Sequence, residues 1–149
     1  MATSKRSTRS LPKQIRGESL EKTELTDVSL AGSRFVDVTL ARVSVTDADA
    51  SASRWENIKA DGVTLSDASV KKATLENVTF AGSSIDDCDL SATKITNVTL
   101  KGARLRDVDL RGVTIEDANI EGLTIDGVRI DRLLEASRTA DQRGRARKK

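Results

Sequence analysis

An apolar residue recurs at every fifth position over most of this 149-residue chain. Counting from Leu25 in steps of five, every position is apolar as far as Ile130, which gives 22 consecutive matches. Because 37% of all residues are apolar, a run of this length has a chance probability below roughly 10⁻⁹. A strand buries every second residue and a helix repeats every 3.6 residues, so neither element alone explains the period. The backbone must instead turn a corner after each group of five residues.

A second series of positions, two residues before each of these centres, is free of charged side chains. Ser and Thr occupy the positions in this series that are not apolar. Its apolar members include Val28, Val38, Ala48, Ile58, Val63, Ala68, Val78, Cys88, Val98, Ala103, Val108, Ala118 and Val128. Repetition on this scale is typical of stacked architectures, in which each unit buries its apolar face against its neighbours. The motifs of leucine-rich repeats and calcium-binding β-helices are absent from the sequence, and its β-branched residues and glycines argue against a coiled coil.

Four segments of the chain resemble consecutive pairs of the unit that defines the pentapeptide-repeat proteins. They are FVDVTLARVSV, LENVTFAGSSI, IDDCDLSATKI and LRDVDLRGVTI. The resemblance covers residues 21–131, although this chain often has Val where Ala is commonest in the family. It implies an all-β fold, a right-handed quadrilateral β-helix in which four pentapeptides form one square coil.

If four pentapeptides form a coil, residues twenty positions apart should stack into columns. An acidic column would contain Asp27, Asp47, Asp67, Asp87 and Asp107, and a glycine column Gly62, Gly82, Gly102 and Gly122. We expect the glycines at corners where the backbone needs a positive φ, which glycine adopts without steric cost. The core is predicted to contain Leu30, Phe35, Leu40, Trp55, Leu65, Leu75, Phe80, Leu90, Ile95, Leu100, Leu110 and Ile120. Ala50 and Ala60 flank Trp55 in its own coil and leave room for the indole.

The sequence divides into three parts. Residues 1–19 form a basic N-terminal segment that we expect to be flexible, residues 20–131 the β-helix, and residues 132–149 a short capping helix with a basic tail. Leu11, Ile15 and Leu20 are candidates for covering the lower end of the rod. At the upper end, residues 123–130 either continue the solenoid or form a hairpin about Asp126-Gly127. Asp131 is then a candidate N-cap for the helix, which we expect to end near Gly144.

Charge follows the same division. The net charge of +2 arises from +4 over residues 1–20, −7 over residues 21–131 and +5 over residues 132–149. An acidic body therefore carries two basic tails. These tails can contact nucleic acid or an anionic surface by long-range attraction, or simply be solvated ends.

The composition does not favour catalysis. The chain has no His, and Cys88 falls in the small buried series, where a thiol is expected to be inert. The sequence contains no cluster of Cys and His that would predict a zinc site, and we expect no cofactor and no small-molecule substrate. It has neither a secretory signal nor an apolar run long enough to span a membrane, so the expected location is the cytoplasm.

The acidic column has two interpretations. Asp accepts hydrogen bonds at turns, and the opposite column, Asp37, Asn57, Asn77, Asn97 and Asp117, mixes Asp and Asn as turn formation alone would predict. Alternatively, the column binds a partner. The leading hypothesis is a non-catalytic scaffold or protein-interaction rod with a partner still to be identified. The resemblance also implies an alternative, a DNA-mimicking inhibitor or protector of the topoisomerase gyrase, and homodimerisation through one end of the rod. The body has about half the charge that a DNA mimic of its length needs.

Overall fold

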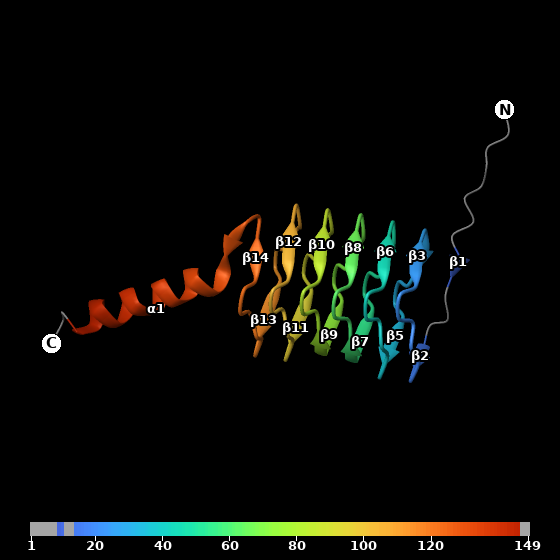
Figure 1. The fold of residues 1–149 in the computed structure, drawn as a ribbon, viewed down its shortest axis with the longest axis horizontal. Helices are drawn as coiled ribbons and strands as arrows, with labels where there is room; N and C mark the ends of the chain where they lie inside the picture. Colours follow the sequence, from blue (N-terminus) through green and yellow to red (C-terminus); the bar gives the residue numbers. More distant parts are fainter. Residues whose placement is uncertain (1–8, 11–13, 147–149) are drawn as a thin grey trace, which may run out of the picture.

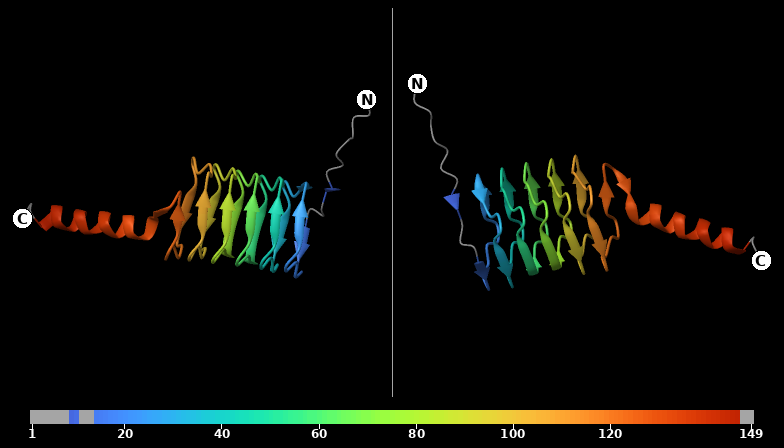
Figure 2. Two further views of the ribbon diagram at one scale, coloured as in Figure 1. Left: turned by 45° about the horizontal axis from the view of Figure 1, so that its top comes forward. Right: turned by 180° about the vertical axis from the view of Figure 1, so that it is seen from behind.

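The computed structural model describes residues 9–10 and 14–146, with side chains described for residues 14–140. Short parallel strands stack along one axis into a four-sided rod, and a single helix projects from the C-terminal end (Figure 1). Strands of successive coils lie next to one another in every view of the rod (Figure 2). The chain is therefore a β-solenoid, as the five-residue period predicts.

One side of the rod, called face A, is a six-stranded parallel sheet. Phe35 pairs with Trp55 and Trp55 with Leu75, so residues twenty positions apart stack as expected. The strands of face A are β2 (Gln14–Arg16), β5 (Arg34–Val36), β7 (Arg54–Lys59), β9 (Thr74–Thr79), β11 (Lys94–Thr96) and β13 (Thr114–Glu116).

The opposite side, called face C, is a seven-stranded sheet whose last strand runs antiparallel. Its strands are β3 (Glu24–Thr26), β6 (Ser44–Thr46), β8 (Thr64–Ser66), β10 (Ser84–Asp86), β12 (Arg104–Arg106), β14 (Thr124–Ile125) and β15 (Val128–Arg129). The two sides between these sheets are held largely by single bridges. Face B runs from Ser19 to Asn119, and face D from Ser29 to Asp109. On face D, β1 (Arg9–Ser10) pairs with β4 (Val28–Ser29).

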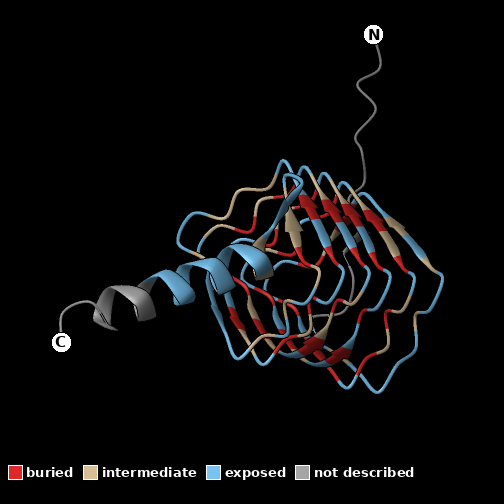
Figure 3. Ribbon diagram, turned by 60° about the vertical axis from the view of Figure 1, so that its left-hand side comes forward, coloured by how far each residue is buried: buried red, intermediate tan, exposed pale blue. Residues whose placement is uncertain are grey.

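The apolar centres of the pentapeptides meet inside the rod. Ten of the twelve residues predicted for the core are no more than 6% exposed. Leu110 and Ile120 are half-buried because no complete coil covers them from the C-terminal side. Figure 3 shows buried residues along the strands of the middle coils, with exposed residues at the corners. The packed interior is thus a single column of side chains along the rod.

Trp55 is the largest side chain in this column. Its ring centroid lies 5.1 Å from that of Phe35 and 6.4 Å from that of Phe80. The buried indole Nε1–H donates to Ser53 Oγ at 2.8 Å, and Ser53 Oγ donates to the Ala50 carbonyl at 2.6 Å. The small neighbours make room for the indole, and one of the buried serines also satisfies its only polar group.

The solenoid begins earlier than predicted. Strand β2 pairs in register with β5, so that Ile15 lies opposite Phe35, and Ser19 bridges to Thr39. The boundary expected at residue 20 therefore falls inside the first coil. Ile15 and Leu20 are half-buried pentapeptide centres of that coil rather than parts of a separate cap, and Leu11 lies outside the described residues.

At the other end the structure decides between the two alternatives for residues 123–130. Thr124 and Ile125 remain in the solenoid and pair with β12, whereas Val128 and Arg129 fold back on β14 as a hairpin. The last match of the five-residue series, Ile130, therefore begins a helix instead of a further coil.

Helix α1 (Ile130–Ala146) starts two residues earlier than predicted and continues past Gly144. Ile130 packs against the core, but every residue from Arg132 to Ala140 is exposed. Only the first turn of α1 thus contributes to a cap, because the hairpin directs the rest away from the rod (Figure 1). Within the described residues, no helix has the length and apolar character needed to span a lipid bilayer.

Candidate functional site

Each pentapeptide turns its corner through one residue with a positive φ. The five residues of the acidic column, Asp27 to Asp107, have φ between 50 and 53°, and the four expected corner glycines, Gly62 to Gly122, between 64 and 73°. Among residues with a side chain, Asn and Asp adopt this left-handed conformation most readily. The corner geometry therefore accounts for a short polar residue in the column, but it does not explain why that residue is always Asp.

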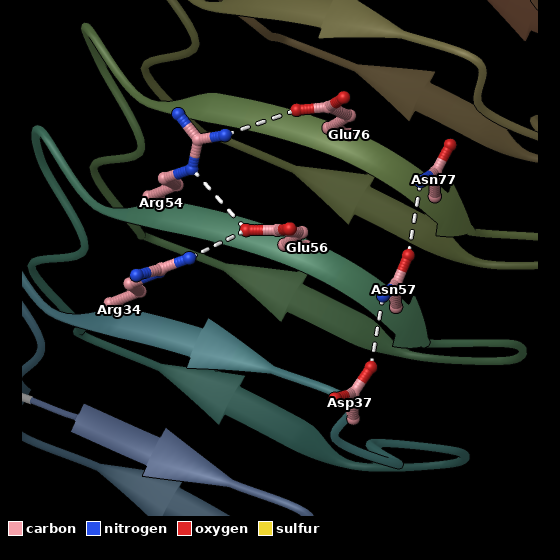
Figure 4. Close-up of polar contacts among 7 residues, drawn as sticks. All are labelled: Arg34, Asp37, Arg54, Glu56, Asn57, Glu76 and Asn77. Atoms are coloured by element: carbon pink, nitrogen blue, oxygen red, sulfur yellow. Dashed lines mark hydrogen bonds and ion pairs between the residues drawn. The ribbon is translucent and has the colours of Figure 1, made fainter.

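The opposite corner shows what Asn provides at the same backbone conformation. Asn57 Nδ2 donates to Asp37 Oδ1 at 2.9 Å, Asn77 Nδ2 to Asn57 Oδ1 at 3.0 Å, and Asn97 Nδ2 to Asn77 Oδ1 at 2.6 Å. The first two of these bonds are drawn in Figure 4. Side-chain amides thus form a ladder along this edge of the rod, which ionised carboxylates cannot do because they have no donor.

The acidic column carries an electrostatic cost instead. Partial desolvation raises the pKa of Asp67, and the negative charges of Asp87 and Asp47 raise it further. Like charges about 4.8 Å apart repel by roughly 0.9 kcal/mol even in bulk water. A column of five aspartates therefore stabilises the fold less than a column of neutral polar residues would.

We expect Asp67→Asn to raise the urea midpoint at pH 7, because Asn suits the left-handed corner and removes the repulsion. The pKa of Asp67 is raised in the folded state, so the penalty exists while the group is ionised and disappears as the pH falls through that pKa. The gain should accordingly shrink towards pH 3. The reverse change, Asn77→Asp, adds a charge and breaks the amide ladder, so it should lower the midpoint. Equal midpoints for Asp67→Asn and the wild type at pH 7 would contradict the account.

Face C, together with the Asp corner, carries most of the net negative charge of the body. Its basic residues are Arg104, Arg106 and Arg129, of which Arg106 is paired with Asp86 and Arg129 with Asp131. Its acidic residues are Glu24, Asp27, Asp47, Asp67, Asp86, Asp87, Asp107 and Asp126. We define these eight side chains as the acidic face. Sequence reasoning found five of them and missed Glu24, Asp86 and Asp126, which could have been found by following the neighbouring twenty-residue columns.

The other faces are close to neutral because their charges alternate in sign. On face A, Arg34 pairs with Glu56 at 3.0 Å and Arg54 with Glu76 at 3.2 Å (Figure 4). On face D, Arg111 pairs with Asp109, whose pKa it lowers to about 2 together with the backbone N–H of Arg111. The rod is therefore electrostatically one-sided.

The side chains described over residues 14–140 form no arrangement suited to catalysis. Cys88 is 3% exposed, its Sγ lies 3.1 Å from the Asp86 carbonyl, and burial raises the pKa of the thiol. These residues also contain no group of three or more potential metal ligands. The voids inside the column are apolar and only about 20 and 30 Å³. A more open hollow of about 340 Å³ lies between the last coil and α1.

These features define a class of protein, a four-sided parallel β-solenoid built from stacked five-residue units. Residues 61–97 and 88–122 match the family model for pentapeptide repeats, in eight copies. Over these residues the chain consists of pentapeptide repeats, and its fold is that of pentapeptide-repeat proteins. Proteins of this kind are generally structural or interaction proteins rather than enzymes.

Solved structures show the same fold. A pentapeptide-repeat protein, Rfr23, from the cyanobacterium Cyanothece 51142 is 18% identical with a TM-score of 0.66, over 76% of this chain and 88% of that one. HetL, which is involved in the regulation of heterocyst differentiation in Nostoc sp. strain PCC 7120, is 21% identical with a TM-score of 0.58. That match covers 78% of this chain and 62% of HetL. QnrB1, a plasmid-mediated fluoroquinolone resistance protein, matches with a TM-score of only 0.37 at 15% identity, over 83% and 94% of the two chains. Curated protein sequences give no match.

Proposed function

We propose that this protein is a non-catalytic interaction rod, in the cytoplasm, which presents its acidic face to a basic surface of a partner protein. The observation that carries this proposal is the segregation of charge, with eight carboxylates against three arginines on face C and near-neutral faces elsewhere. A one-sided charge distribution steers a partner of opposite sign and selects the face that it meets.

The size of the face limits the kind of complex. Seven strands about 4.8 Å apart make a surface about 30 Å long, and a width of about 15 Å gives about 450 Å². A stable interface of standard size buries about 800 Å² on each partner. A partner that binds firmly must therefore also reach round the Asp corner to face D, which is near neutral because Lys71 lies near Asp49 and Asp89 and Arg111 pairs with Asp109.

A topoisomerase as the partner is the second candidate. It is favoured by the straight acidic column, which places one carboxylate on each coil in strict register. Duplex DNA carries one charge per about 1.7 Å, so a rod about 30 Å long would need about 18 charges to imitate it fully. The acidic face supplies eight, which favours a basic protein surface in general over a site that has been shaped for DNA.

Reversing the charge of the column tests the proposal. In the triple variant Asp47→Lys, Asp67→Lys and Asp87→Lys the fold should be kept, because Lys22 and Lys72 already occupy corners with φ of 58 and 57°. A control variant, Asp37→Lys with Asp117→Lys, reverses charge at the opposite corner. Partners should be retained from lysate by the wild type and the control but lost by the triple variant, with purified partners binding at least about a hundredfold more weakly. Retention of the same partners by all three proteins would refute the acidic face as the binding surface.

A supercoiling assay with purified gyrase then separates the two candidates. Inhibition or protection by the wild type at micromolar concentration, lost in the triple variant, would favour the topoisomerase. No effect on gyrase would exclude it and leave the general interaction role standing.

A further inference from the structure

The C-terminal end of the rod leaves backbone groups without a next coil. In the fifth coil, the N–H of Asn97 donates to the Glu116 carbonyl and the N–H of Leu100 to the Asn119 carbonyl. The equivalent donors in the sixth coil are the N–H groups of Asp117 and Ile120, for which the described residues provide no backbone acceptor. An unpaired edge of this kind accepts an added strand.

Face C is closed differently at the same end. Strand β15 covers the edge of β14, and the N–H of Gly122 donates to Asp131 Oδ2 at 3.0 Å. The open edge therefore runs along β13 and the segment that ends at Glu121. It lies beside the hollow of about 340 Å³ between the last coil and α1. The hollow is lined by the apolar residues Ala118, Ile120 and Leu134 and by polar residues that contribute more of its surface.

The charged residues that line the hollow are three carboxylates, Glu121, Asp131 and Glu135, and one basic residue, Arg138. Glu121 and Asp131 already pair with Lys101 and Arg129. Among the residues whose side chains are described, Glu116, Asp117 and Glu135 have no salt bridge. An occupant that is extended and basic would thus satisfy both the free N–H groups and the free carboxylates.

The chain itself contains a segment with this chemistry at its other end. Residues 1–16 contain five basic and no acidic side chains, and include Lys5 and Arg6. The segment is extended where it is described, because Arg9 and Ser10 form β1 against β4. Residues 1–8, when extended, reach about 27 Å beyond β1. In one molecule β1 and α1 lie at opposite ends of the rod (Figure 1), so the occupant must come from a second copy.

We propose that the basic N-terminal segment of one copy adds as a strand along Asp117–Glu121 of the next, in the hollow under α1. Lys5 and Arg6 lie against Glu116 and Glu135 in this arrangement. The contact is heterologous, because each copy offers its N-terminal segment at one end and its hollow at the other. It therefore generates open head-to-tail chains rather than a closed dimer.

Sedimentation velocity with the full chain tests the proposal. At 50 mM salt the average mass should keep rising with protein concentration up to about 200 µM, and the rise should weaken at 500 mM salt because screening acts on the charge pairs. A donor-dead variant, Lys5→Glu with Arg6→Glu, and an acceptor-dead variant, Glu116→Arg with Glu135→Arg, should each associate at least about tenfold more weakly. All four substitutions are on charged side chains, and far-UV circular dichroism checks that both variants are folded.

Mixing the two variants gives the sharpest result. The donor-dead protein keeps its hollow and the acceptor-dead protein keeps its N-terminal segment, so the mixture should form a one-to-one dimer that grows no further. A mixture that stays monomeric, or a wild type that is monomeric throughout or stops at a dimer, would overturn the proposal. The control, Asp47→Arg with Asp67→Arg, should assemble like the wild type. Loss of assembly in this control alone would show that the basic segment binds the acidic face, which overturns the site under α1 but not the proposed function.

Discussion

Replacing Trp55 by Ala is expected to lower the free energy of unfolding by about 3–5 kcal/mol, the largest effect of any single truncation in this chain. Trp55 is 5% exposed and contacts the aromatic rings of Phe35 in the preceding coil and Phe80 in the following coil. The core is one column wide, so a cavity in it has few neighbours that can move to fill it. The change also removes the indole N–H that donates a hydrogen bond to the Ser53 hydroxyl.

Urea unfolding followed by far-UV circular dichroism measures this loss of stability. Fluorescence is unsuitable because Trp55 is the only tryptophan and its signal disappears with the substitution. Trp55→Phe should recover part of the stability, since it restores most of the buried apolar area but not the hydrogen bond. Arg54→Ala serves as the neighbouring surface control. Arg54 is exposed and pairs with Glu76, so its loss should cost no more than about 1 kcal/mol. A Trp55→Ala variant within 1 kcal/mol of the wild type would show that the interior is loosely packed.

The interior of the solenoid could be predicted because its physics repeats. Leu65 and Leu105 point inward for the same reason, because both are centres of a pentapeptide. A single period therefore determines both the register and the stacking of the coils. Each coil adds an independent test of the pattern, and Phe35, Trp55 and Leu75 accordingly stack as the twenty-residue spacing requires. Errors in a single pentapeptide have little effect on such an inference.

The ends could not be predicted in the same way, because each is a single event. Asp126-Gly127 suits a hairpin, yet Asp or Gly also occupies many ordinary corners of this rod, so local residue type did not separate the alternatives. Ile15 and Leu20 fit the five-residue series but lie in a basic stretch, and its composition suggested a tail. The exposure of Leu133 and Leu134 depends on the direction of α1, which the hairpin sets and no periodicity encodes.

The acidic face was predictable only in part, for a related reason. The column from Asp27 to Asp107 is visible in the sequence because the same residue recurs every twenty positions. The contributions of Glu24, Asp86 and Asp126 come from two neighbouring columns in which acidic residues occur only once or twice. Their significance depends on the near-neutral pairing of the other faces. Such pairing joins residues 22 positions apart, as in Arg34 with Glu56, and becomes visible only with the side chains placed.

Replacing Asp131 by Ala should detach α1 from the rod. One carboxylate connects three elements here, since it accepts from the Gly122 N–H of the last coil at 3.0 Å, from the Arg132 N–H of the helix at 2.9 Å, and from Arg129 of β15. Its side chain is only 16% exposed. Without it, the Gly122 N–H loses its acceptor and the hairpin loses its ion pair. A helix of 17 residues in water is only marginally stable on its own, so α1 should fray once this anchor is removed.

Hydrogen exchange locates the effect. Amides of β15 and the first two turns of α1 should exchange at least about tenfold faster in Asp131→Ala, while those of β7 to β11 remain unchanged. Asp131→Asn keeps an acceptor for the Gly122 N–H but loses the ion pair with Arg129, so its exchange rates should lie between those of the wild type and Asp131→Ala. Asp117→Ala, an acidic corner residue of the same coil, serves as the matched control. Faster exchange throughout the rod would contradict a local anchor.

The ionisation of Asp131 gives an independent test of the same anchor. Arg129 first, and then the Gly122 N–H, hold the pKa of this carboxyl well below its usual range. A carboxylate with a depressed pKa stabilises the folded state fully above the unfolded-state value of about 3.9, and this contribution is lost as the pH falls from there through the folded pKa. The protection of α1 in the wild type should therefore be constant from pH 7 to about pH 5 and decline below pH 4. In Asp131→Ala the protection of α1 should be low already at pH 7. The difference in protection between the wild type and this variant should therefore become smaller as the pH falls. A constant difference down to pH 2 would show that the ionised carboxylate of Asp131 is not what fastens the helix to the rod.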